Sequence, residues 1–211
     1  MDGTNRIKAV ELLLVAAFLA VATVAIIVIL PKAAPADGSG STAEPEVIAQ
    51  TASGPLTTAD RDFLFKIRQA GLWEIPSGNM AQNKSNNQKV KDVGRILAAD
   101  HAKLDEQVRA LAGQLGVVLP SEPNENQKKW LAEEMAASPG EEFDRIFANR
   151  LRLAHGSVFA TIAQVRAGTR NDQIRAFAEV GNTFVLKHMR LLESTGLVDH
   201  NQLPQPPAPS Q

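Results

Sequence analysis

The chain contains no cysteine and no tyrosine among its 211 residues, and aromatic residues make up only 5% of it. Without cysteine there is no disulfide, no thiolate metal ligand, no thiol nucleophile and no thiol-linked lipid. The 22 basic and 23 acidic residues nearly balance, and no basic block alternates with aromatic residues, which argues against a nucleic-acid partner. The lack of cysteine is compatible with any redox compartment.

A long apolar segment lies near the N-terminus. Residues 12–30 are uncharged, and as a helix they would extend about 28 Å, close to the hydrocarbon thickness of a bilayer. Arg6 and Lys8 precede this run and favour a cytoplasmic location for residues 1–11. We therefore predict a single-pass cell-membrane anchor with the remaining chain outside the cytoplasm. The alternative is a secreted protein whose signal peptide is cleaved near residues 34–36, which have a small-x-small pattern.

Two further segments have the composition of unfolded chain. Residues 31–55 are rich in Ala, Pro, Gly, Ser and Thr and bury too little apolar surface to offset the entropy of ordering, which predicts a flexible linker. Residues 200–211 are rich in proline and are predicted to form a disordered tail. The folded domain is therefore expected over residues 56–199.

Within residues 56–199 the apolar patterns have helical spacing, and no segment shows sustained period-two alternation. Four long helices are predicted to start at Thr57 or Thr58, near residue 88, at Ser138, and at Thr169 or Asn171. A short helix over residues 124–137 would place Trp130, Leu131 and Met135 against one end of the core. Short turns separate the first two and the last two long helices. We therefore predict an all-α, antiparallel four-helix bundle with a short extra helix between the second and third helices.

The start of the third long helix has a detailed sequence pattern. Ser138 is expected to cap it, Pro139 to occupy the first helical position, and Glu141 to complete a capping box.

Four polar residues interrupt apolar stripes, each on a different predicted helix: Glu74, His101, His155 and His188. Buried polar groups cost free energy unless they are paired, so convergence of the four would indicate a polar cluster or a metal site. Counting 1.5 Å per residue from the turns places the first three nearly level and His188 one to one and a half turns deeper. Two interpretations are open: one divalent Zn, Fe, Mn or Cu ion, or a metal-free network.

Two nearby acids have other expected roles. Asp100 is predicted to be a surface or inter-helix partner rather than a ligand, and Asp144 is predicted to belong to another polar layer or a cap.

The order and spacing of several short motifs resemble a bacterial ferritin-like family of unknown function, whose members are often labelled outer-membrane or secreted proteins. These motifs are Asp62-Phe63, Leu72-Trp73-Glu74, Gly78-Asn79-Met80-Ala81, Asp100-His101, Phe143-Asp144, His155 and His188. The resemblance spans roughly residues 60–195 and implies an extracytoplasmic four-helix bundle without an established activity. Phe147 stands where relatives usually have tyrosine, which weakens any role for a hydroxyl there. A helical anchor also fits poorly with the outer-membrane label.

A di-iron centre is not expected, although the ferritin resemblance suggests one. Such sites use Glu-x-x-His pairs, and here Ala98 and Val185 stand three residues before His101 and His188. No nucleophile constellation indicates an enzyme. The leading prediction is a non-enzymatic binding or structural envelope protein. The alternative is a single-metal protein for storage, sensing or redox chemistry. Homo-oligomerisation through the helical surface is a third hypothesis, and the sequence identifies no protein partner.

Overall fold

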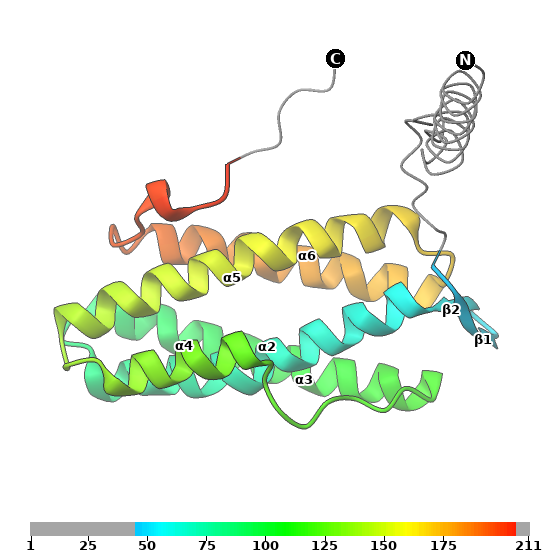
Figure 1. The fold of residues 1–211 in the computed structure, drawn as a ribbon, viewed down its shortest axis with the longest axis horizontal. Helices are drawn as coiled ribbons and strands as arrows, with labels where there is room; N and C mark the ends of the chain where they lie inside the picture. The colour runs from blue at the N-terminus through cyan, green and yellow to red at the C-terminus, as the bar shows by residue number, and fades with distance from the viewer. Residues whose placement is uncertain (1–44, 206–211) are drawn as a thin grey trace, which may run out of the picture. The chain divides into compact units, whose positions relative to one another are not determined.

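The computed structural model describes residues 45–205, which form a mostly helical fold with five helices, a two-stranded sheet and one 3-10 turn (Figure 1). The predicted cytoplasmic segment, the anchor and residues 31–44 of the predicted linker lie outside the described residues, as do residues 206–211. Within residues 45–205, no helix is long and apolar enough to cross a membrane.

The long helices occur where the apolar periodicity predicts them. They are α2 (Thr58–Lys84), α3 (Gln88–Leu115), α5 (Glu141–Gly168) and α6 (Asp172–Glu193). The shorter α4 (Glu125–Ala136) belongs to the connection between α3 and α5. Helix α2 packs against α3 and α5, and α6 likewise packs against α3 and α5, so each long helix contacts two others.

Several helix ends confirm the predicted capping residues. The Thr57 side chain accepts a hydrogen bond from the Asp60 backbone N–H at 3.2 Å, and the Asp60 carboxylate accepts one from the Thr57 backbone N–H at 2.9 Å. Asn124 caps α4 and Asn171 caps α6. At the end of α3, Gly116 adopts φ 70°, a left-handed conformation that favours glycine.

The predicted cap of α5 is wrong. The helix begins at Glu141 with Gly140 as its N-cap, and no side chain caps it. Gly140 has φ 96°, a backbone conformation that residues with a Cβ rarely adopt. Ser138 instead lies before the turn, where its backbone N–H donates to the Glu142 carboxylate at 3.0 Å.

The prediction that residues 31–55 form only a linker needs correction. Strands β1 (Val47–Thr51) and β2 (Gly54–Thr57) pair antiparallel. Leu56 in β2 is buried in the core, and the Asn171 side chain donates to the Gly54 carbonyl at 3.1 Å. The hairpin therefore belongs to the folded domain. The predicted tail also begins with a 3-10 turn, η1 (His200–Gln202).

The apolar core consists of two clusters. One includes Phe63, Leu104, Ile162 and Phe177. The other includes Trp73, Val93, Leu97, Phe143, Phe147 and Leu151. Along α3, α5 and α6 the three histidines fall between the positions of these clusters, and on α2 Glu74 directly follows Trp73 of the second cluster. The polar layer is therefore enclosed by apolar side chains on both sides, which limits the water that can reach it.

Candidate metal centre

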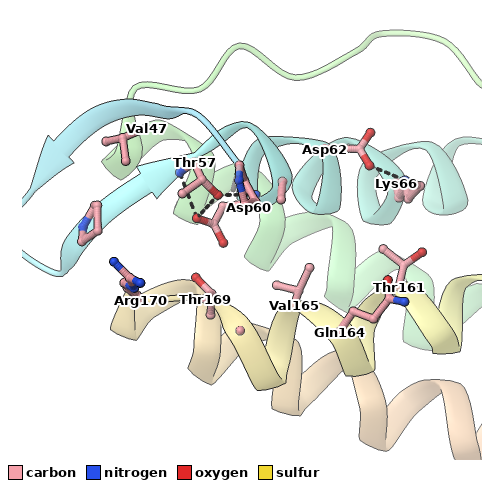
Figure 2. Close-up of a pocket in the computed structure, with 14 residues that line it drawn as sticks. Val47, Thr57, Asp60, Asp62, Lys66, Thr161, Gln164, Val165, Thr169 and Arg170 are labelled. Atoms are coloured by element: carbon pink, nitrogen blue, oxygen red, sulfur yellow. Dashed lines mark hydrogen bonds and ion pairs between the residues drawn. The ribbon is translucent and has the colours of Figure 1, made fainter. Parts of the chain in front are cut away.

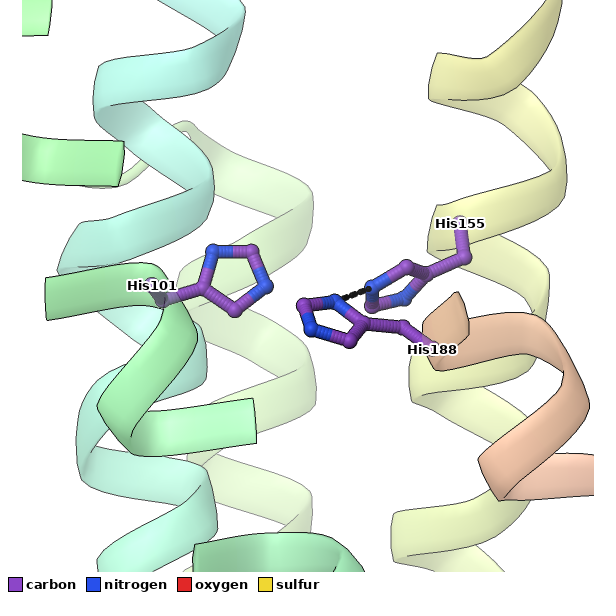
Figure 3. A group of neighbouring side chains, drawn as sticks. All are labelled: His101, His155 and His188. Carbon is purple, nitrogen blue, oxygen red and sulfur yellow. Dashed lines mark hydrogen bonds between the residues drawn. The ribbon is translucent and has the colours of Figure 1, made fainter. Parts of the chain in front are cut away.

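The four polar residues predicted from the apolar stripes come together between the long helices. The Oε2 atom of Glu74 lies 2.9 Å from His101 Nε2 and 3.5 Å from His155 Nε2. Each histidine offers a ring nitrogen, and these three nitrogens lie within 4.8 Å of one another. All four residues are at most 5% exposed. Figure 3 shows the three imidazoles pointing toward one another from α3, α5 and α6.

His188 reaches the cluster although the residue count placed it deeper along its helix. Its ring centre lies 5.1 Å from that of His101 and 5.1 Å from that of His155. Counting residues from a turn measures position along one straight axis. It omits helix tilt, offsets between the helices and the reach of an imidazole.

The His155 ring is oriented by its own helix. Its Nδ1 lies 2.8 Å from the Leu151 carbonyl oxygen one turn earlier. A carbonyl can only accept a hydrogen bond, so His155 Nδ1 is the donor and holds the ring proton. In a neutral His155 imidazole the Nε2 atom therefore has a free lone pair, and this atom faces the centre of the cluster.

The His188 ring is oriented by an acid on another helix. Its Nε2 lies 3.1 Å from Asp100 Oδ2, an oxygen that also binds the exposed Lys187 ammonium. Burial opposes ionisation of Asp100, but its hydrogen bonds to Lys187 and His188 outweigh burial and lower its pKa. An ionised carboxylate only accepts, so His188 Nε2 holds the proton and Nδ1 has a free lone pair. Asp100 is thus an inter-helix partner, as the sequence suggested.

These two outer hydrogen bonds leave two lone pairs facing each other. His155 Nε2 and His188 Nδ1 are 3.0 Å apart, yet each ring has already used its proton outside the cluster. Two neutral imidazoles in these tautomers repel at that contact. Either an additional proton or a bound cation is required between the two nitrogens.

An additional proton is disfavoured in this environment. Burial lowers the pKa of His188 to about 3, and the nearby His155 and His101 rings act in the same direction. Burial also lowers the pKa of His155, although the Glu74 carboxylate opposes this effect. The His155–His188 pair is therefore poorly suited to holding an imidazolium at neutral pH.

Glu74 and His101 also present atoms without partners. Among the described residues, neither Glu74 Oε2 nor either ring nitrogen of His101 has an aligned hydrogen bond, despite the 2.9 Å separation between Oε2 and Nε2. Burial would raise the pKa of Glu74, but the facing His101 and His155 rings reverse this effect and lower it. Buried polar atoms rarely lack partners unless they bind an ion or water.

The closest separations within the cluster fit ligands of one ion, and the group of described residues whose ligand atoms all lie within 4.8 Å of one another consists of the three histidines. Ligands at about 2.1 Å from a metal are about 3.0 Å apart at a right angle and about 3.4 Å apart at the tetrahedral angle. The closest contacts, from Glu74 Oε2 to His101 and His155 and from His155 to His188, span 2.9–3.5 Å. Imidazole and carboxylate ligands suit Zn, Fe, Mn and Cu.

Glu134 on α4 is a buried acid that the sequence analysis missed. It is fully buried, and neither of its carboxylate oxygens has an aligned hydrogen bond within residues 45–205. The predicted buried face of this helix included Met135, which is 65% exposed. Glu134 follows Gln127 by seven residues, about two helical turns, and both are buried. A buried face drawn through these two positions would have predicted the burial of Glu134. Asp144 is buried as well, but it does not belong to the histidine cluster.

A separate cleft of about 470 Å³ lies between β1, β2, the start of α2 and the end of α5 (Figure 2). Its polar lining is largely engaged within the fold, because Thr57 and Asp60 form the α2 capping box and Lys66 pairs with Asp62. No metal-ligating group of the kind formed by the three histidines occurs in its described lining. The histidine cluster is therefore the stronger candidate site.

Residues 45–194 match the model of a protein family described as "Domain of unknown function (DUF4142)". The chain belongs to this family. The match includes both strands and all five helices, and therefore Glu74 and the three clustered histidines. No curated protein and no solved structure matches the chain. The predicted resemblance to a family of unknown function is thus confirmed.

Proposed function

We propose that this protein binds one divalent metal ion through Glu74, His101, His155 and His188. The proposed ligand atoms are Glu74 Oε2, the Nε2 atoms of His101 and His155, and His188 Nδ1. The protein would act as a binding protein for storage, sensing or redox use of the metal, without a di-iron centre.

The strongest support for this proposal is that His155 Nε2 and His188 Nδ1 direct their lone pairs at each other. Their outer nitrogens donate to a carbonyl and a carboxylate, so their inner nitrogens face each other at 3.0 Å without a proton. Metal-bound histidines usually donate their second ring N–H to such acceptors. A cation converts a repulsive contact into two ligand bonds.

The setting we propose for this site is a ferritin-like four-helix bundle, anchored in the cell membrane by residues 12–30 and facing away from the cytoplasm. Four long helices that each contact two others are compatible with a bundle. The uncharged run of residues 12–30 supports the anchor. A structural envelope role with a metal-free polar network is the alternative.

Metal content tests the proposal directly. The purified full-length chain is stripped with a chelator, equilibrated separately with Zn²⁺, Cu²⁺, Mn²⁺ and Fe²⁺, freed of excess metal, and measured by elemental analysis. We expect one equivalent of at least one metal. Because the chain has no cysteine, thiolates cannot contribute to the signal.

The chain provides a matched control in its remaining histidine. His101→Ala and His155→Ala should each lose stoichiometric metal. His200→Ala should retain it, because His200 is exposed in η1. The absence of stoichiometric metal in the wild type for all four ions would refute the proposal and leave the structural role.

A further inference from the structure

Helix α4 covers one side of α2 and α5, the helices that carry the proposed ligands Glu74 and His155. It packs against both helices. The Trp130 ring lies 5.5 Å from that of Trp73, which directly precedes Glu74. Glu133 holds α5 through a bidentate ion pair with Arg150, with distances of 2.7 and 2.8 Å.

The inner face of α4 presents Glu134 to α2, where it faces Ser77, one turn after Glu74. The other charged groups nearby are Glu74 and Lys84 of α2, Arg150 of α5 and Glu133 of α4 itself. Lys84 Nζ donates to the carbonyl oxygens of Glu134 and Met135 rather than to the carboxylate, and Arg150 is paired with Glu133. Within the described part of the chain, no cation forms an ion pair with the Glu134 carboxylate.

We propose that α4 is a lid whose docking depends on Glu134, and that a metal ion at Glu74 holds it closed. This inference rests on the proposed metal-binding function. In the metal-free protein, ionisation of Glu134 places an unpaired charge in a buried site near the negative Glu74, which loosens α4. A divalent ion at Glu74 changes the local charge from negative to positive, so an ionised Glu134 is tolerated and α4 stays docked.

The ionisation of Glu134 should open and close this lid near neutral pH. Burial raises the pKa of Glu134 to about 7; the Ser77 hydroxyl opposes this shift, and the charge of Glu74 adds to it. The metal-free lid should therefore be closed at pH 5–6 and loosened at pH 8–9. With metal bound, this pH dependence should weaken and its midpoint should fall, because the ion offsets the charge of Glu74 whereas the burial of Glu134 remains.

The two tryptophans report directly on the lid. Trp73 and Trp130 are the chain's only tryptophans, and there is no tyrosine, so near-UV circular dichroism and fluorescence emission report chiefly on their contact. The full-length protein is titrated from pH 5 to 9, first metal-free and then with one equivalent of Zn²⁺. We expect a shift of emission to longer wavelength with a midpoint near pH 7 in the metal-free protein, and a smaller transition with a lower midpoint with zinc.

Glu134→Gln should remove the transition without metal, because glutamine stays neutral. Glu125→Gln should keep it, because Glu125 is exposed on the same helix. Glu134→Met provides a second neutral variant, and far-UV circular dichroism checks that each variant folds.

An unchanged transition in Glu134→Gln, or no transition in the metal-free wild type, would overturn the proposal that α4 is a lid. Zinc that binds without weakening the transition or lowering its midpoint would overturn the coupling. Failure to bind zinc would refute the proposed function while leaving the metal-free titration interpretable.

Discussion

At the scale of single residues, the chemistry of the cluster depends on where each imidazole places its second nitrogen. His155 and His188 both direct an N–H outward, to the Leu151 carbonyl and the Asp100 carboxylate. These partners select the tautomers that aim lone pairs inward. In the proposed metal site, Asp100 would therefore orient His188 for metal binding without being a ligand itself.

Replacing Asp100 with Asn should weaken metal binding by about 10–100-fold, the usual effect of losing a partner of a ligating histidine. The substitution removes the negative charge that fixes the His188 tautomer. Competition with a chelator of known affinity measures the change. Asp105→Asn is the matched control, since Asp105 lies on the same helix but pairs with Arg68 and Arg109. Equal affinities for Asp100→Asn and the wild type would contradict this role.

Glu134 should make the stability of the metal-free protein depend on pH. Burial raises its pKa from 4.5 to about 7, so the folded state holds this proton more tightly than the unfolded chain does. The resulting stabilisation is fully present below pH 4.5 and is lost as pH rises through about 7. The loss amounts to at most about 3 kcal/mol. The free energy of unfolding, measured with urea at pH 5 and pH 8, should change less with pH in Glu134→Gln than in the wild type. An identical change in the two proteins would rule out this role of Glu134.

The four candidate ligands could be predicted from the sequence because each interrupts an otherwise apolar helical stripe. The roles of Asp100 and Glu134 were harder to predict. The contact of Asp100 with His188 depends on how α3 and α6 face each other, which local spacing does not determine. On the short α4, few residues define the buried face. The prediction that Met135 lies on this face implied that the neighbouring Glu134 lies outside it.

At the scale of elements, the spacing of α2 and α3 depends on two glycines. A Cβ atom on Gly78 would lie 2.4 Å from the Gly94 carbonyl oxygen, and one on Gly94 would lie 2.8 Å from the Gly78 carbonyl oxygen. The two backbones therefore approach closely, one turn beyond Glu74. This close approach helps Glu74 and His101 to meet.

Gly78→Ala should destabilise the fold by about 1–3 kcal/mol, the usual cost of overpacking, and should weaken metal binding by separating α2 from α3. Gly113→Ala is the control, because nothing lies within 4 Å of its added methyl. Within α3 that change should stabilise by about 0.5–1 kcal/mol. Chemical unfolding of both variants measures the difference, and equal effects would contradict close packing at Gly78.

Helix positions could be predicted well because periodicity and capping residues are local signals. Asn124 and Asn171 mark real starts. The β1–β2 hairpin was missed because strands of five and four residues are too short to show alternation, and their stability comes from non-local contacts such as the one with Asn171. At the start of α5, the serine-proline pattern suggested a cap that Gly140 provides instead.

At the scale of the whole molecule, the proposed ligands come from α2, α3, α5 and α6. One ion would therefore link the α2–α3 pair to the α5–α6 pair, which supports the contacts between them. Such a link acts only in the folded state and shifts the folding equilibrium by mass action.

Metal should raise the thermal stability of the protein. With free Zn²⁺ at about 100 times its dissociation constant, the gain is about 2.7 kcal/mol, visible as a higher Tm by circular dichroism at 222 nm. His155→Ala should show no such gain, whereas His200→Ala should behave like the wild type. A Tm that zinc leaves unchanged in the wild type would count against a metal link between the helices.

X-ray absorption at the zinc edge of the zinc-loaded full-length protein tests the metal centre most directly. We predict one zinc per chain with three nitrogens and one or more oxygens at about 2.0–2.2 Å, and with outer-shell scattering from imidazole rings. A spectrum of oxygen ligands alone, without imidazole scattering, would contradict a site built from His101, His155 and His188.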